Sequence, residues 1–282
     1  MSDTESWDLI VKPHTKWHDL RLGEIFKYKD LLLLFVKRDF VSVYKQTILG
    51  PVWFFIQPII TSITFTVIFG NLAKISTDGL PPVLFYMCGI TLWNYFADTL
   101  NKTSDTFTAN ANIFGKVYFP RMIVPLSVVL SNLIKLAVQF ILFLCIWSFY
   151  LAKTNTLNPN YTLLLIPFLI ILIGFLGLSF GIIISSMTTK YRDLKFLISF
   201  GVQLLMYASP IVYPLSIVPG KYKWLILANP VTSIIETFKY AFLGVGEFSW
   251  WNLGYSLIFT LILFFIGLVI FHRVEKSFMD TV

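Results

Sequence analysis

The chain has 282 residues, of which 56% are hydrophobic and 13% are charged, with a mean hydropathy of +0.75 and a net charge of +7. Soluble domains are about 45–50% apolar and about 25% charged, so this composition excludes a soluble globular protein. It is typical of a protein that crosses a membrane several times.

Residues 1–50 are predicted to form a cytoplasmic segment that ends in an amphipathic helix. The N-terminus has no basic stretch followed by an apolar run, so we expect no cleaved signal peptide. From Gly23 to Gly50, apolar residues interleave with lysine and arginine, as in helices that lie in the membrane interface. Such a helix is either a membrane-surface anchor or a docking element for a cytoplasmic partner, and the pattern fits both.

Six charge-poor runs approach the roughly 20 residues that a helix needs to cross a bilayer. The predicted fold class is an all-α integral membrane protein with a six-span domain over residues 51–272. Between the last two spans, residues 217–249 contain apolar stretches too short to cross, which are expected to form re-entrant external helices. The spans are expected at about 51–73, 83–101, 122–150, 161–187, 196–216 and 250–271.

The distribution of basic residues predicts the orientation. Of the 22 lysines and arginines, sixteen fall on the side of the N-terminus, five fall on the other side, and Lys135 lies within a span. The positive-inside rule therefore places both termini in the cytoplasm, together with the loop 102–121 and the tail 273–282. The net positive charge then reflects topology and contact with membrane lipids, and nucleic acid is not an expected partner.

Four segments resemble permease subunits of ABC-2 type transporters that export cell-surface polysaccharides. They occur in the family's order and extend over nearly the whole chain, and the O-antigen (lipopolysaccharide) export branch is the most similar. Permeases for teichoic acid or capsular polysaccharide are the alternatives within the family. The segments are KRDFVSVYKQTILGPVWFFIQPI (37–59), KVYFPRMIVP (116–125), TTKYRDLKFLISFGVQLLMYASPIVYPLSIVP (188–219) and NPVTSIIETFKYAFLG (229–244).

The resemblance implies a transport subunit of the bacterial cytoplasmic (inner) membrane that works as a homodimer with two copies of an ABC ATPase. The implied cargo is a polysaccharide linked to a polyprenyl diphosphate. No GxxxxGK[ST] pattern occurs in the sequence, so ATP and Mg²⁺ are expected on the separate ATPase chain. We therefore expect this chain to be no enzyme and to hold no cofactor of its own.

The resemblance also assigns candidate residues to an ATPase interface, formed by the amphipathic helix and the loop 102–121. Polar and charged side chains suit such a contact because they stay solvated until a partner binds. An ordinary membrane anchor and an ordinary connecting loop are the alternatives. The candidates are Arg38, Asp39, Tyr44, Lys45, Gln46, Asn110, Asn112, Lys116 and Arg121.

Polar stripes inside the spans suggest a channel. Polar side chains in hydrocarbon face another helix or a wet cavity, and both remain possible for each stripe. Aromatic rings would suit a path for sugars. The channel-lining candidates are Trp53, Phe54, Gln57, Thr61, Lys135, Gln203, Tyr207 and Tyr213.

Lys135 is the least expected of these candidates, because it lies about 18 Å along its span. Asp98 is the nearest intraspan carboxylate, but its place near the cytoplasmic end would require a shift in depth for pairing. Lys135 is either a snorkelling or hydrated lysine, or a contact for a lipid-linked diphosphate.

In the external segment, Glu236 and Lys239 are three residues apart and share a helical face. They form either a surface ion pair or, with Pro230, part of the extracytoplasmic gate that the resemblance implies. No arrangement of residues indicates catalysis or metal binding. A stand-alone channel or secondary transporter would need ionisable relays within the spans, and apart from Lys135 the sequence has almost none. A membrane transferase would need clustered carboxylates or histidines at one interface, and the sequence shows no such cluster.

Overall fold

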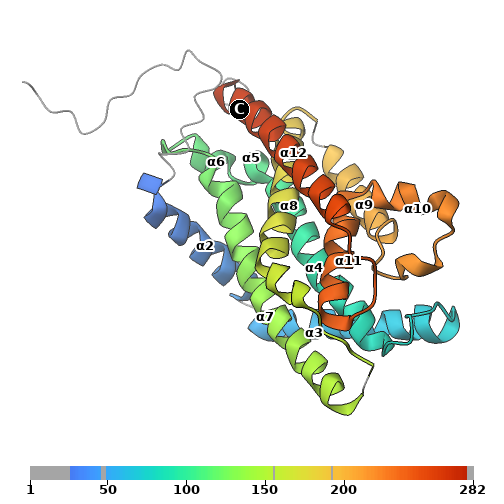
Figure 1. Ribbon diagram of the computed structural model, residues 1–282. Coiled ribbons are helices and arrows are strands. Elements are labelled where there is room, and N and C mark those ends of the chain that lie inside the picture. Colours follow the sequence, from blue (N-terminus) through green and yellow to red (C-terminus); the bar gives the residue numbers. More distant parts are fainter. Residues whose placement is uncertain (1–25, 46–48, 155, 192, 278–282) are drawn as a thin grey trace, which may run out of the picture.

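The structure is a computed structural model that describes residues 26–45, 49–154, 156–191 and 193–277, and all regular structure in these ranges is helical (Figure 1). This confirms the all-α fold class. The helices are α2 (Lys29–Tyr44), η1 (Gly50–Val52), α3 (Trp53–Phe65), the π-helix η2 (Thr66–Leu72), α4 (Pro82–Ser104), α5 (Thr106–Ala109), α6 (Ala111–Phe114), α7 (Ile123–Lys153), η3 (Tyr161–Leu165), α8 (Ile166–Thr188), α9 (Leu194–Tyr207), η4 (Leu215–Ile217), α10 (Gly220–Leu227), α11 (Pro230–Leu243) and α12 (Trp250–Ser277).

Four of these helical segments are long and apolar enough to cross a membrane: Gly50–Leu72, Ile123–Lys153, Tyr161–Thr188 and Trp250–Glu275. They coincide with the first, third, fourth and sixth expected spans. Helix α4 covers the expected second span and has 23 residues, but its second half carries Asn94, Asp98 and Lys102. Helix α9 has 14 residues and ends at Tyr207, well before the expected end of the fifth span.

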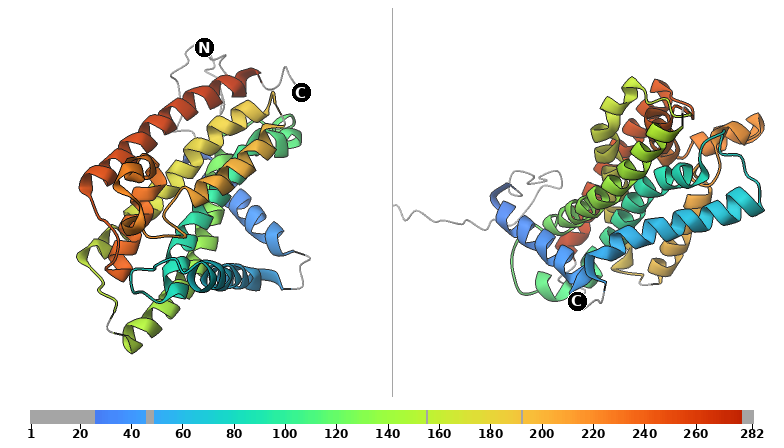
Figure 2. Two further views of the ribbon diagram at one scale, coloured as in Figure 1. Left: turned by 90° about the vertical axis from the view of Figure 1, so that its right-hand side faces the viewer. Right: turned by 90° about the horizontal axis from the view of Figure 1, so that it is seen from below.

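Helix α4 lies at the centre of the bundle, where it packs against α3, α7, α8, α9 and α11 (Figures 1 and 2). Its close contact with α8 depends on small residues of α8. A Cβ atom added at Gly181 would lie 2.4 Å from the Cβ of Thr103, and one added at Gly174 would lie 2.5 Å from the Tyr95 hydroxyl. Small side chains at such contacts let two helices approach closely within a membrane.

Helix α2 lies beside the bundle and packs mainly on α7, as the blue ribbon in Figure 1 shows. Before α3 begins, Gly50 adopts a φ of 49°, which a glycine tolerates without strain. Pro51 follows at the first turn of the helical segment, where its missing N–H costs no hydrogen bond. This turn sets the direction in which the chain enters the first span.

Helix α11 is inside the bundle, packed against α4, α8 and α12. Its start is capped by the Asn229 side chain, which accepts a hydrogen bond from the backbone N–H of Val231. It ends at Gly244, whose φ of 73° is the left-handed conformation of a glycine cap. The segment expected to be external and re-entrant therefore contains one short exposed helix, α10, and one buried helix, α11.

Candidate functional site

Helix α2 has one face against the bundle and one exposed face. Phe35 and Val36 are buried, and the Phe35 ring lies 5.6 Å from the ring of Phe119. On the other side, Leu33 and Leu34 are about 60% exposed and Lys37 is exposed. The helix is thus attached through one side and presents basic and apolar groups on the other.

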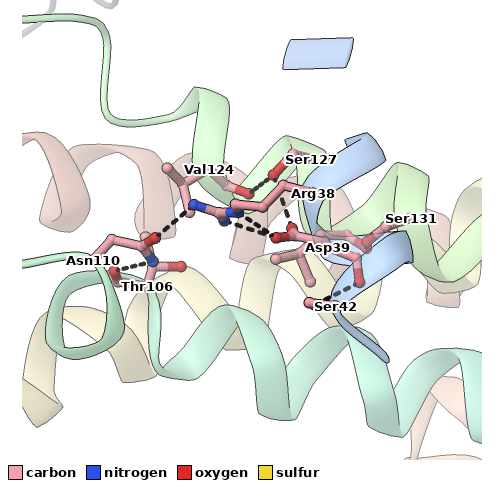
Figure 3. Close-up of polar contacts among 9 residues, drawn as sticks. Arg38, Asp39, Ser42, Thr106, Asn110, Val124, Ser127 and Ser131 are labelled. Atoms are coloured by element: carbon pink, nitrogen blue, oxygen red, sulfur yellow. Dashed lines mark hydrogen bonds and ion pairs between the residues drawn. The ribbon is translucent and has the colours of Figure 1, made fainter. Parts of the chain in front are cut away.

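A polar network joins α2 to two other parts of the chain (Figure 3). The Arg38 guanidinium pairs with the neighbouring Asp39 carboxylate, with Nη2 2.7 Å and Nε 2.8 Å from Oδ1. Arg38 Nη1 also donates to Asn110 Oδ1 at 3.5 Å, and the Ser127 hydroxyl donates to Asp39 Oδ2 at 3.4 Å. Asn110 lies between α5 and α6 and Ser127 lies in α7, so this pair of charges connects three elements.

The Asn110 side chain is itself held in place. It is buried, and its Nδ2 donates to the Thr106 carbonyl at 3.0 Å (Figure 3). Arg38 is packed as well, with its guanidinium carbon 4.5 Å from the Phe35 ring centroid. Arg38, Asp39 and Asn110, which were candidates for an ATPase interface, therefore make their contacts within the chain.

Arg121 connects the same loop to the end of α12. Its Nη1 donates to the Glu275 carbonyl at 2.8 Å, and its backbone N–H donates to Glu275 Oε1 at 3.3 Å. Burial lowers the pKa of the Arg121 guanidinium from its usual value, and the nearby Glu275 carboxylate opposes this shift. His272 Nδ1 lies 3.2 Å from Glu275 Oε2, so the loop and the last helix share one polar cluster.

The remaining interface candidates differ in exposure. Lys45, Asn112 and Lys116 are exposed. Gln46 and the side chain of Tyr44 lie outside what the structure describes. The exposed candidates and the exposed face of α2 are available to a partner, whereas the buried Asn110 and the partly exposed Arg38, Asp39 and Arg121 connect that surface to the bundle.

A half-open cavity of about 170 Å³ lies between α2, α3, α4 and α7. The Lys135 ammonium is 2.6 Å from Asp98 Oδ2 across it, and the Lys102 ammonium donates to Asn132 Oδ1 at 2.9 Å. We call this space the Lys102 cavity. Its lining residues are Asp39, Phe40, Phe54, Asp98, Lys102, Ser131, Asn132 and Lys135.

The ion pair answers the question that Lys135 raised. Asp98 lies six residues before the end of α4, about 9 Å along the helix axis. Because Lys135 contacts this carboxylate directly, it lies near the same end of the bundle and no shift in depth is needed. The inward face of α7 also includes Ser127, Ser131 and Gln139, which are all buried.

The expected channel residues fall into two groups. Phe54 is buried and lines the Lys102 cavity with Lys135. Trp53, Gln57 and Thr61 lie on the other side of α3, where Trp53 is 48% exposed. Gln203 and Tyr207 on α9 are exposed, and Tyr213 in the following turn is half-buried. The rest of the described chain thus leaves these polar groups of α3 and α9 uncovered, on faces that also expose apolar side chains such as Ile60 and Phe200.

The expected gate residues Pro230, Glu236 and Lys239 are all buried. The surface ion pair considered for Glu236 and Lys239 is therefore wrong, because both side chains are only 2% exposed. Lys239 Nζ lies 3.8 Å from Glu236 Oε1, 3.8 Å from the Phe85 ring centroid, and donates to the Pro210 carbonyl. Helical spacing placed both residues on one face but could not tell that this face is covered.

Sequence reasoning missed the roles of Lys102, Asn132 and Thr99. In the sequence, Lys102 is only one of the basic residues at the end of a span. Asn132 follows Ser131 directly and so lies outside the four-residue spacing of Ser127, Ser131, Lys135 and Gln139. The Asn132 amide bridges them, since it accepts from Lys102 and donates to the Thr99 hydroxyl at 3.4 Å. The available signal for this contact was a polar residue, Asn132, beside the polar face of one span, together with a lysine, Lys102, at the end of another span.

The fold and these contacts define a class: an all-helical, multi-pass membrane protein whose peripheral amphipathic helix is bonded to a connecting loop and to a membrane span. Residues 30–243 match the ABC-2 type transporter family, and the chain belongs to this family. This confirms the resemblance found in the sequence.

Similar proteins extend over most of the chain. It is 30% identical over 265 residues to an O-antigen export system permease protein RfbA of Klebsiella pneumoniae, with 92% of this chain and 96% of the relative covered. It is 24% identical over 221 residues to RfbA of Myxococcus xanthus, with 78% and 82% covered. It is 25% identical over 240 residues to the polysialic acid transport protein KpsM of Escherichia coli, with 83% and 89% covered.

Proposed function

We propose that the chain is the permease subunit of an ATP-driven exporter that moves a polyprenyl-diphosphate-linked polysaccharide, such as O-antigen, across the bacterial cytoplasmic membrane. The observation that carries this proposal is the similarity to O-antigen export permeases over nearly the full length of both chains. Such a subunit binds and guides cargo, while ATP and Mg²⁺ are held by a partner ATPase. Both termini lie in the cytoplasm, as the basic residues predict.

The ATPase docks on the exposed face of α2 and on the exposed part of the loop 102–121. Lys37, Lys45 and Lys116 are cations of this surface, and they are exposed in the structure, as is Lys29 at the start of α2. Behind it, Arg38 and Asp39 contact Asn110 and Ser127. A shift of α2 on ATP binding would reach α7 through these contacts.

Two copies of the chain form the channel. The first span, Gly50–Leu72, is mostly uncovered in one copy. Trp53, Gln57 and Thr61 lie on its uncovered side. Gln203 and Tyr207 on α9 offer a second exposed face with polar groups. These faces are largely apolar, but each carries a glutamine, whose polar group is better placed against a second copy or in a wet channel than against lipid. In this arrangement α4 and the segment 196–216, which begins in α9, complete six crossings per copy, α10 and α11 form the external gate segment, and α11 is its buried part.

Export of a capsular polysaccharide is the second candidate function. It is favoured by the similarity to KpsM, a polysialic acid transport protein. The identity is lower than to the O-antigen relative, 25% against 30%, and so is the covered share of the chain. Teichoic acid is the remaining cargo class. A stand-alone channel is disfavoured because the family is one of ABC transporter permeases.

The test is co-expression with the ABC ATPase encoded beside the gene, followed by purification and export of polyprenyl-diphosphate-linked polysaccharide in proteoliposomes. The wild-type pair should co-purify and export. The triple variant Lys37→Glu/Lys45→Glu/Lys116→Glu should weaken the complex at least about tenfold, or about 1.4 kcal/mol. The control Lys153→Glu/Lys221→Glu reverses exposed charges at the other end of the molecule and should leave the complex intact.

Two results would contradict the proposal. A wild-type chain that binds no ATPase would exclude the exporter. A complex that exports only polysaccharide on another lipid carrier would replace O-antigen by a capsular cargo.

A further inference from the structure

The Lys102 cavity has room for more than ordered water. Its volume is about 170 Å³, and one water molecule occupies about 30 Å³ in the liquid. Its lining supplies both ammonium donors and carboxylate acceptors. The two lysine ammonium groups each donate one hydrogen bond among the described residues, to Asn132 and to Asp98, out of three that an ammonium can donate.

Pairwise accounting leaves one positive charge in excess. Asp39 is paired with Arg38 at 2.7 Å, and Asp98 is paired with Lys135 at 2.6 Å. The remaining ionisable group of the lining is Lys102, whose hydrogen-bond acceptor is the neutral amide of Asn132. The cavity is therefore suited to a single negative charge placed between Lys102 and Lys135.

The position of the cavity matches a lipid headgroup rather than the hydrocarbon. Lys102 is two residues from the end of α4, and Phe54 is in the first turn of α3.

We propose that the Lys102 cavity binds the phosphate ester of a membrane lipid, as a singly charged phosphodiester held between the ammonium groups of Lys102 and Lys135. An inner-leaflet glycerophospholipid supplies this group. A lipid-linked diphosphate also carries phosphate, but it brings more negative charge than the one surplus cation compensates. The headgroup is thus a structural ligand that goes beyond the proposed transport function.

The bound phosphate would link α4 to α7, because Lys102 and Lys135 are the cationic groups of the lining. From α2 the lining includes only Phe40 and the Asp39 carboxylate, which is paired with Arg38 and offers no donor to a phosphate.

The experiment is native mass spectrometry of the full chain in detergent, titrated with dioctanoyl phosphatidylglycerol. Dioctanoylglycerol, which lacks the phosphate, and farnesyl diphosphate, which carries two, serve as comparison ligands. The wild type should bind one phosphatidylglycerol per chain, and should bind both comparison ligands at least about tenfold more weakly.

Two near-isosteric variants should shift the affinity in opposite directions. Asn132→Asp gives Lys102 a carboxylate partner and should weaken phosphatidylglycerol binding about tenfold, whereas Asp98→Asn adds a surplus cation and should strengthen it. Lys116→Gln, at an exposed lysine of the loop, is the control and should have no effect. A variant that only loosened the fold would not produce two shifts of opposite sign.

Equal affinities for the two variants and the wild type would overturn the proposal. Tighter binding of farnesyl diphosphate than of phosphatidylglycerol would also overturn it, and would assign the cavity to the diphosphate of a lipid-linked substrate.

Discussion

Two groups of paired charges contact the central helix α4, and they differ in their access to the surroundings. In the Lys102 cavity, the side chains of Lys135 and Asp98 are 16% and 32% exposed. In the pair of Lys239 and Glu236, which we call the Lys239 pair, both side chains are 2% exposed. The first can exchange partners with a ligand, whereas the second has only protein groups around it. A lysine–carboxylate pair thus suits ligand binding in the Lys102 cavity and holds helices together in the Lys239 pair.

The Lys239 pair connects segments that are far apart in sequence. Lys239 donates to the Pro210 carbonyl in the turn after α9, and Glu236 Oε2 accepts from the backbone N–H of Glu247 before α12. Phe85 of α4 lies against the ammonium. These contacts hold α11 to the turn after α9 and to the turn before α12.

The largest effect is expected for Lys239→Met, which leaves Glu236 buried without its cation. Breaking a buried pair in this way costs about 3–5 kcal/mol, so we expect a large fall in thermal stability and in the yield of monodisperse protein. Removing the second charge as well, in Lys239→Met/Glu236→Gln, should restore part of the loss. Thermal unfolding in detergent measures both, and an unchanged midpoint for the single variant would contradict the fixing role.

The Lys102 cavity and the Lys239 pair both contact α4, which packs closely on α8. Gly181→Ala should disturb this packing. The added Cβ would lie 2.4 Å from Thr103, and overpacking of this kind costs about 1–3 kcal/mol. Gly254→Ala is the matched control, since no atom lies within 4 Å of its added Cβ. Thermal unfolding should separate the two variants, and equal midpoints would show that α4 yields to the methyl group at little cost.

A smaller effect is expected for Lys135→Met in the Lys102 cavity. Asp98 is one-third exposed and stays partly hydrated, so the loss should be about 1 kcal/mol, nearer to that of a surface pair. The comparison with Lys239→Met in one unfolding series is the informative measurement. If Lys135→Met and Lys239→Met lost equal stability, the different exposure of the two ion pairs would not affect their contribution to the free energy of unfolding.

The smallest change in stability is expected for Ser127→Ala. Its hydroxyl lies 3.4 Å from Asp39 Oδ2 but only 2.8 Å from the Val124 carbonyl, so the contact with Asp39 should be worth less than the about 0.5–1.5 kcal/mol of a typical hydrogen bond. Hydrogen exchange of α2 should rise while global unfolding changes little. Unaltered exchange in α2 would mean that this contact does not hold the helix.

The sequence predicted the elements that depend on local composition. Charge-free runs located four spans, because length and apolarity decide whether a helix can cross a bilayer. The end of α9 was not predicted, since Pro210 and Pro214 lie in an apolar stretch whose turn has no charge to mark it. The six-span topology stays a prediction.

Pairings between distant residues were beyond the sequence. The periodicity identified Lys135 and the polar stripe of α7, but its contact with Asp98 depends on how α4 and α7 are aligned along their axes. The pattern likewise marked Arg38 and Asp39 as polar without showing that they turn toward Asn110 and Ser127. The proposed docking residues therefore divide into an exposed set and a connecting set only once the packing is known.

The most direct test of this division compares assembly with coupling in the permease–ATPase complex. Asp39→Asn keeps the shape of a connecting residue and removes its charge, whereas Lys37→Glu/Lys45→Glu changes only the exposed face of α2. We predict that Asp39→Asn still co-purifies with the ATPase but exports several-fold less polysaccharide per ATP hydrolysed. The surface variant should lose the ATPase itself. Wild-type export per ATP by Asp39→Asn, or loss of the ATPase from that variant, would contradict the account.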